Sequence, residues 1–362
     1  MVESRLSWKR LRDNKVFWPV AVLALLLLFN AIFTPGFFRL EIKEGHLFGT
    51  LVDILNRGSI PALLAIGMTL VIATGGIDLS VGAVIAISAC TATVLINPNL
   101  ATGLPTAAEM VQDITYTPMW LLILVALVIS ALCGAWNGLL VSRGNIQPMV
   151  ATLVLMVAGR GIAQLIVNGQ IITVYYTPYY YIGNGFLLGV PFTLFIVLAV
   201  FLLAWLITRK TAIGLFLESV GINSRASFYS GIGERNIKLL AYTFCGFCAG
   251  IAGLIYSSNV RSADANNAGL MTELDAILAV VLGGTLMTGG RFSLLASIVG
   301  AWVIQTTTTT MYALGVPAMA AQALKGLVVL IVVLLYSQQA RDGIGRLIEG
   351  AGALLAKKGV QS

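Results

Sequence analysis

The stretch VIATGGIDLSVGAV, from Val71 to Val84, places an aspartate just behind a pair of glycines in otherwise apolar sequence. Between Gly58 and Pro98, Asp78 is the only Asp, Glu, Lys, Arg or His residue. A bare carboxylate at the centre of a bilayer costs roughly 2.5–3.5 kcal/mol on insertion scales. Asp78 must therefore either lie away from the centre or be satisfied by neighbouring groups.

The composition is typical of a membrane protein. Of the 362 residues, 58% are hydrophobic and only 10% are charged, whereas an average soluble domain carries about 25% charged residues. The mean hydropathy of +0.92 leaves too little polar surface to coat a soluble fold. Because the apolar runs are too long and unbroken for the alternating strands of a membrane barrel, we predict an all-α, polytopic integral membrane protein.

About ten transmembrane helices are expected, because a helix needs roughly 20 residues to cross the hydrocarbon. The predicted spans lie near residues 17–36, 58–76, 79–97, 119–142, 148–168, 190–207, 238–257, 273–290, 293–312 and 318–336. The transmembrane domain, 17–336, is then flanked by an N-terminal segment, 1–16, and a C-terminal tail, 337–362.

The basic residues predict the orientation of these spans. With the N-terminus in the cytoplasm, sixteen Lys and Arg residues fall in inner segments and three in outer ones. This asymmetry is the positive-inside pattern, so we expect both termini to be cytoplasmic. The net charge of +7 is explained in the same way, and no nucleic-acid partner is implied.

Two connections are longer or more polar than the rest. The inner connection 208–238 has about thirty residues, which is long for a simple connector and makes it a functional candidate. The outer connection 259–275, NVRSADANNAGLMTELD, is the most polar region apart from the termini.

Two pairs of similar segments suggest an internal two-fold repeat. VIATGGIDLSVG, 71–82, and AVVLGGTLMTGG, 279–290, both run from apolar residues into Gly-Gly and then reach another glycine. GAWNGLL from Gly134 and GAWVIQT from Gly300 share Gly-Ala-Trp. Short glycine-rich matches also arise by chance in membrane sequences, so both explanations stay open.

The opening stretch has a structural and a functional interpretation. Structurally, Gly75 and Gly76 end the second span, and Asp78 or Ser80 caps the start of the third, where the positive helix end favours a carboxylate. Functionally, the stretch is a broken-helix element that lines a pathway or meets a cytoplasmic partner. The two interpretations are compatible.

Four blocks carry a family resemblance: IGMTLVIATGGIDLSVGAV, GNIQPMVATLVLMVAGRG, TRKTAIGLFLESVGINSRASFYSGI and ELDAILAVVLGGTLMTGG. Their order is similar to that of permease subunits of bacterial monosaccharide ABC importers, of the ribose/xylose/arabinose/galactose type. FGTLVDILNRGSIPALLAIGMTLVIATGGIDLSVGA and RSADANNAGL further resemble the galactofuranose branch. The first block contains the motif residues Gly75, Gly76, Asp78, Ser80 and Gly82.

The resemblance covers roughly residues 50–336 and departs from the family pattern in small ways. Val220 and Ser227 stand where the family has Ala. Neither departure puts the family assignment in doubt.

The chain lacks the G-x-x-x-x-G-K-[ST] loop that cradles ATP phosphates. The resemblance implies that a separate ATPase subunit binds ATP and Mg and docks on the inner connection, so this chain needs no cofactor of its own. The alternative is that the connection is an ordinary solvated loop. The candidate coupling residues are Gly214, Glu218, Gly221, Asn223, Arg225 and Gly231.

Polar residues inside the spans are candidates for lining a sugar pathway. Threonine hydroxyls can instead bond carbonyls of their own helix, and Asn or Gln can hold helices together. Both interpretations stay open for the pathway candidates Asn137, Thr152, Gln164, Gln305, Thr306 and Gln322.

Polar residues of the outer connection could meet a periplasmic sugar-binding protein, although an ordinary solvated loop is equally compatible. The candidates are Arg261, Asp264, Asn266, Asn267, Glu273 and Asp275.

Three residues inside predicted spans need a separate explanation. Arg160 either pairs with a carboxylate or extends to the interface, and the sequence does not choose. Cys245 and Cys248 have C-x-x-C spacing, but they lie one helical turn apart in an apolar run, so we expect them to be small packing residues.

We therefore predict a non-catalytic permease subunit of an ATP-driven monosaccharide importer in the bacterial inner membrane. The resemblance implies three partners: an ATPase, a periplasmic binding protein and a second permease chain, identical or paralogous. An ion-coupled carrier is the alternative, but it would want more intramembrane carboxylates than Asp78. A membrane enzyme would need paired acids or a metal cluster, which the sequence does not suggest.

Overall fold

A computed structural model describes residues 16–43, 45–102, 115–317, 320, 323–327 and 330. The chain falls into two compact units, Met1–Thr306 and Thr307–Ser362. The elements below belong to the first unit, except for the last part of the final helix. The predicted N-terminal segment, apart from Val16, and the predicted C-terminal tail lie outside the described residues.

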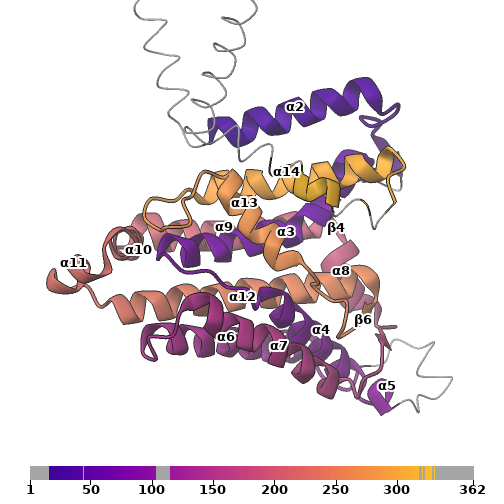
Figure 1. Cartoon of the computed structure of the whole chain (residues 1–362). Coiled ribbons are helices and arrows are strands. Elements are labelled where there is room, and N and C mark those ends of the chain that lie inside the picture. Colours follow the sequence, from indigo (N-terminus) through magenta and orange to yellow (C-terminus); the bar gives the residue numbers. More distant parts are fainter. Residues whose placement is uncertain are drawn as a thin grey trace, which may run out of the picture. The chain divides into compact units, whose positions relative to one another are not determined.

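Helices make up most of the described chain (Figure 1). They are α2 (Phe17–Phe33), α3 (Thr50–Ala73), α4 (Val81–Ile96), α5 (Asn99–Thr102), α6 (Met119–Ser142), α7 (Pro148–Ile166), α8 (Thr177–Asn184), α9 (Phe192–Lys210), α10 (Ile213–Ile222), α11 (Ser224–Tyr229), α12 (Glu234–Val260), α13 (Thr272–Leu282) and α14 (Leu294–Ala313).

The described chain is mostly helical, as predicted, and its strands are only two or three residues long. They form three antiparallel pairs: β1 (Glu41–Lys43) with β2 (His46–Phe48), β3 (Ile172–Thr173) with β6 (Ser262–Ala263), and β4 (Phe186–Leu187) with β5 (Val190–Pro191). All of them lie in connections between helices. Where the chain reverses direction, the pairing satisfies backbone groups that no helix satisfies.

Five of the described helices are long and apolar enough to cross a membrane: α3, α6, α7, α9 and α12. The helix α6 has the bounds predicted for the fourth span. A described helix lies in every predicted span except 318–336, most of which is outside the described residues. The total of ten crossings stays a prediction.

The predicted eighth span, 273–290, is not one continuous helix. Its helix α13 has 11 residues and ends at Leu282, so it is roughly 16 Å long, about half of the hydrocarbon thickness. Residues 283–293 continue without helical structure until α14 begins. The glycine pair Gly283-Gly284 ends the helix.

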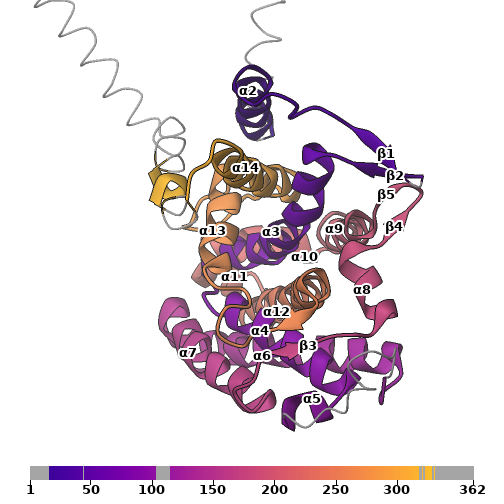
Figure 2. The ribbon, with the colours of Figure 1, turned by 90° about the vertical axis from the view of Figure 1, so that its right-hand side faces the viewer.

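The centre of the first unit is formed by α12 and α3. The helix α12 packs against α6, α3 and α4, and Figure 2 shows α3 and α12 side by side with other helices around them. Cys245 and Cys248 are free and fully buried, as expected of packing residues, and the thiol of Cys245 also hydrogen-bonds Asp78. They lie against Gly67 of α3, where a side chain would displace them.

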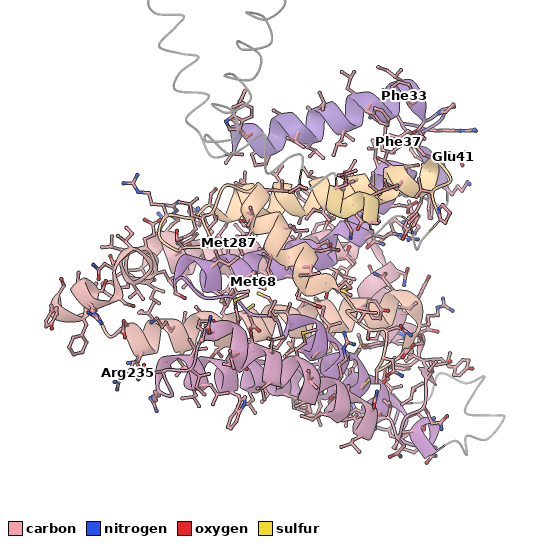
Figure 3. The ribbon with its side chains drawn as sticks, in the orientation of Figure 1. Phe33, Phe37, Glu41, Met68, Arg235 and Met287 are labelled. Carbon is pink, nitrogen blue, oxygen red and sulfur yellow. The ribbon has the colours of Figure 1, made fainter. Side chains whose placement is uncertain are left out.

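Three of the connections predicted to be outside meet at one end of this unit. Pairing of β3 with β6 joins two of them, and the N–H of Leu47 donates to the carbonyl of Gly189 at 3.0 Å, which joins the third. The helices α10 and α11 lie at the opposite end (Figure 1). Figure 3 places Arg235 toward that end and Glu41 at the other. Which end faces the cytoplasm stays a prediction.

Candidate functional site

The Gly-Gly pair of the opening stretch breaks the chain between α3 and α4. The N–H of Gly76 donates to the carbonyl of Val71 at 3.2 Å, and Gly75 has a φ of +80°, which favours glycine. This is the glycine-terminated helix end known as a Schellman motif. The prediction that these glycines end the second helix is confirmed.

Asp78 is buried in this break, and polar groups surround it. Its Oδ1 accepts hydrogen bonds from the Ser80 N–H at 2.9 Å and the Ser80 hydroxyl at 2.7 Å. Asn137 of α6 donates to the Ser80 hydroxyl at 2.8 Å and reaches Asp78 Oδ1 at 3.4 Å. Ser80 occupies the N-cap position of α4, but the side chain that receives a backbone N–H is that of Asp78.

The surface of α6 indicates the depth of this network. Its exposed large residues recur every four positions, and Trp120 and Trp136 lie at the two ends. The two tryptophans are sixteen residues, or roughly 24 Å, apart along the helix, and tryptophan favours the membrane interfaces. Asn137 follows Trp136, so we expect Asp78 to lie near one interface, away from the bilayer centre. Its carboxyl group is hydrogen-bonded to Ser80 and Asn137.

The second Gly-Gly pair ends α13 in the same way as the first ends α3. The N–H of Thr285 donates to the carbonyl of Val280 at 3.2 Å, and Gly284 has a φ of +73°. Gly284 therefore corresponds to Gly75, a shift of one residue from the match read in the sequence. The common helix end is compatible with a repeat but does not establish one.

A polar cavity of about 310 Å³ lies beside the first break. It is lined by Thr74, Gly75, Gly76, Val141, Asn145, Ile146, Gln147, Pro148, Lys238 and Tyr242. Hydroxyl, amide and ammonium groups of this kind can hydrogen-bond a hydroxyl-rich solute. Apart from Gly75 and Gly76, the sequence alone did not single these residues out, because they lie near predicted span ends that are distant in sequence.

The inner connection is largely helical. Asn223 caps α11, because its Oδ1 accepts the N–H of Ala226 at 3.0 Å. Gly231 ends that helix with a φ of +82°, and Gly214 packs against the carbonyl of Thr208. Arg225 is exposed. The candidate coupling residues therefore divide into residues that shape the connection and residues that face outward.

Exposed apolar side chains on α10 and α11 were missed by the sequence analysis. Phe228 and Tyr229 are 66% and 87% exposed, and Leu215 and Ile222 are also exposed. A cavity of about 600 Å³ lies at the junction of α11 and α12 and is lined in part by Arg225, Phe228 and Tyr229. The signal in the sequence was the pair Phe228-Tyr229, which is flanked on both sides by polar and small residues.

The pathway candidates are not gathered in one place. Thr152 and Thr306 donate to carbonyls of their own helices at 2.9 and 2.7 Å, as the structural interpretation expects. Asn137 joins the Asp78 network, whereas Gln164 is exposed on α7 and donates to Asn266. Gln305 lies on α14 next to Gly58 of α3. Gln322 is outside the described residues.

Arg160 fastens the outer connection to α7. Its Nη1 donates to the carbonyl of Ala265 at 3.2 Å and to the carbonyl of Ala268. Gln164, one turn further along α7, holds Asn266 of the same turn. The absence of a side chain at Gly82 of α4 leaves room for the carboxylate of Glu273, which is only 4% exposed.

The other docking candidates have different surroundings. Burial opposes the ionisation of Asp264, but hydrogen bonds from Asn267 and Asn266 outweigh it and hold the pKa of this carboxyl below its usual value. The guanidinium of Arg261 lies over the ring of Tyr180 at 3.7 Å. Asp275 lies in the first turn of α13. The outer connection is thus an ordered turn whose polar groups contact one another and side chains of neighbouring segments.

Residues 50–335 match the family described as the permease component of the branched-chain amino acid transport system. The chain is 48% identical over 327 residues to a galactofuranose transporter permease of Escherichia coli K12, covering 89% of this chain and 91% of that protein.

Further relatives are permeases for other sugars. The chain is 38% identical to a fructose import permease of Bifidobacterium longum NCC 2705, covering 90% of this chain and 88% of that protein. It is 34% identical to a ribose import permease of Escherichia coli K12, covering 87% and 92%. No solved structure matches the chain.

Proposed function

Because the chain belongs to the family of branched-chain amino acid transport system permease components, we propose that it is the membrane permease of an ATP-driven importer whose substrate is a monosaccharide. The family description names amino acids, whereas the relatives at 34–48% identity are named for sugars. Their similarity extends over nearly the whole chain, and this observation carries the proposal of a sugar. The same similarity also favours a permease subunit over an ion-coupled carrier or an enzyme.

Galactofuranose is the proposed sugar. The identity to the galactofuranose permease, 48%, exceeds that to the ribose permease, 34%, by a wide margin. The chain would act in the bacterial inner membrane with both termini in the cytoplasm, as the distribution of basic residues predicts.

The proposed partner at the inner end is a separate ATPase subunit. Phe228 and Tyr229 are exposed apolar side chains that would stand in water unless a protein covers them. The cavity that they line also contains the charged residues Arg225, Glu234 and Arg235, so this surface does not resemble a lipid-facing one. At the other end, the ordered outer connection would receive a periplasmic sugar-binding protein. A second permease chain would complete the assembly.

The proposed pathway passes the polar groups near the two helix breaks. Asn137 is the best-supported of the candidates, because its buried Oδ1 has no hydrogen-bond partner among the described residues. The cavity lined by Asn145, Gln147 and Lys238 adds groups that can bind sugar hydroxyls. Movement of the inner connection would open and close this route by alternating access.

The test is uptake by proteoliposomes that contain this chain with a candidate ATPase subunit and a candidate sugar-binding protein. We expect ATP-dependent accumulation of labelled galactofuranose that an ionophore does not abolish. Ribose, fructose and leucine serve as competitors in the same assay. Preferential competition by another sugar would change the substrate but keep the function, whereas uptake driven by an ion gradient without ATP would overturn the function.

A further inference from the structure

Three chain segments that are far apart in the sequence meet at one point beside the inner connection. They are the end of α3 at Ala73–Gly75, the residue Gly221 near the end of α10, and the connection between α13 and α14 at Thr288–Gly290. We name this meeting point the glycine junction. All three segments belong to the first unit of the chain.

Gly221 contacts the other two segments through its backbone. A β-carbon on this residue would overlap both the carbonyl oxygen of Ala73 and the N of Gly290. These two groups are themselves joined, because the N–H of Gly290 donates to the carbonyl of Ala73 at 2.9 Å. The backbone of α10 therefore rests directly on a hydrogen bond that links the two helix breaks.

Gly289 closes the junction from the other side. A β-carbon there would lie 2.8 Å from the N of Gly75 and 3.0 Å from the carbonyl oxygen of Gly221. Its φ of +92° also favours glycine. Thus glycines from all three segments allow backbone to pack on backbone with no side chain between them.

When one segment moves, a backbone-to-backbone contact passes more of the displacement to the next segment than a contact between side chains does. A side chain can change rotamer and absorb a shift, whereas packed backbone segments move together or separate. From this geometry we infer that Gly221, Gly75 and Gly289 are positioning residues for transport: they make α10 and both helix breaks move as one body. The inference rests on the proposed function, in which the ATPase moves α10.

The inference distinguishes Gly221 from its neighbour Arg225. Arg225 is exposed on α11 and lies outside the junction, so its substitution would affect the ATPase contact itself. Gly221 touches both helix breaks through its backbone, so its substitution would disturb the transfer of movement to the breaks.

The first test compares Gly221→Ala with the control Gly161→Ala. Gly161 lies on α7, outside the inner connection, and no atom lies within 4 Å of the position of its β-carbon. In the reconstituted complex we expect Gly221→Ala to keep ATP hydrolysis but lose transport per ATP, while Gly161→Ala keeps both. Equal transport per ATP in the two variants would overturn the inference.

A second measurement keeps all the glycines, in case Gly221→Ala does not assemble. Spin labels at Leu215→Cys and Thr288→Cys, both exposed positions, report the separation of α10 from the second break. We expect this separation to stay constant between nucleotide-free and ATP-trapped complexes, while a label pair from Leu215 to the outer residue Leu188 changes. A change in the first separation would overturn the inference. Absence of ATP-dependent uptake by the unsubstituted complex would instead contradict the proposed function, and the label pair would still report on the junction.

Discussion

The side-chain amide of Asn137 donates a hydrogen bond to the hydroxyl of Ser80 at 2.8 Å, and so joins α6 to the break between α3 and α4. Ser80 in turn donates to Asp78 through both its N–H and its hydroxyl. Three residues separated by up to 59 positions thus form one buried polar network. Its stability depends on the carboxylate, which accepts from both other residues.

Asp78→Ala is expected to destabilise the chain by about 1–3 kcal/mol, because buried donors of Ser80 and Asn137 lose their acceptor. Asp78→Asn should cost less, since the amide oxygen can still accept the Ser80 N–H. Thermal unfolding of the purified chain measures both effects. Asp53→Ala, an exposed position on α3, is the control, and an Asp78→Ala midpoint equal to that of the control would contradict the prediction.

Gly76→Ala should also destabilise the chain, by about 1–3 kcal/mol, as overpacking does in other cores. The reason is local: a β-carbon at Gly76 would overlap the hydroxyl oxygen of Tyr242, a fully buried residue. Removing that hydroxyl with Tyr242→Phe should partly rescue the variant, although Tyr242→Phe alone loses the hydrogen bond to the Ile77 carbonyl. Unfolding midpoints of the two single variants and the double variant form the test. Purely additive losses would show that the two residues do not collide.

Arg160→Gln should loosen the outer connection, because the carbonyls of Ala265 and Ala268 lose their donor. Hydrogen exchange of the peptide 262–272 is expected to accelerate. Arg160→Lys should restore only part of the protection, since an ammonium lacks the planar fork of a guanidinium.

Gln164→Ala tests the second attachment of the same turn. Because both residues hold one segment, the double variant with Arg160→Gln should depart from additivity. The exposed Arg57→Gln on α3 is the charge-matched control. Unchanged exchange in Arg160→Gln would mean that other contacts hold the turn.

Phe228→Ala and Tyr229→Ala should each weaken binding of the proposed ATPase subunit about tenfold, since exposed aromatic side chains frequently anchor interfaces. Membrane insertion and thermal stability should not change, because neither side chain is buried in the chain itself. Leu188→Ala, 88% exposed at the opposite end, controls for loss of an exposed apolar residue. The measurement is affinity in detergent, and full affinity in both aromatic variants would remove these residues from the interface.

The helices and their breaks could be predicted from the sequence because both depend on short stretches of chain. A long apolar run is stable as a helix in lipid, and the bounds of α6 were therefore predicted correctly. A glycine pair ends a helix through its own local geometry. The family could be identified for a related reason, since its blocks are contiguous and in order, and the matched region 50–335 confirms it. The break within the predicted eighth span was missed, because the hydropathy of 273–290 averages over the glycine pair at 283–284.

The partners of the polar residues depended on tertiary structure alone. Nothing in the local sequence of Asp78 reveals that Asn137 lies beside it, and Arg160 was equally ambiguous until α7 was placed against the outer turn. The same holds for the glycine junction, in which Gly221 meets residues about 148 positions before it and 69 after it. Hydropathy and helix termination are properties of neighbours along the chain, whereas hydrogen bonds and close backbone contacts arise only when the packed helices bring distant residues within a few ångströms.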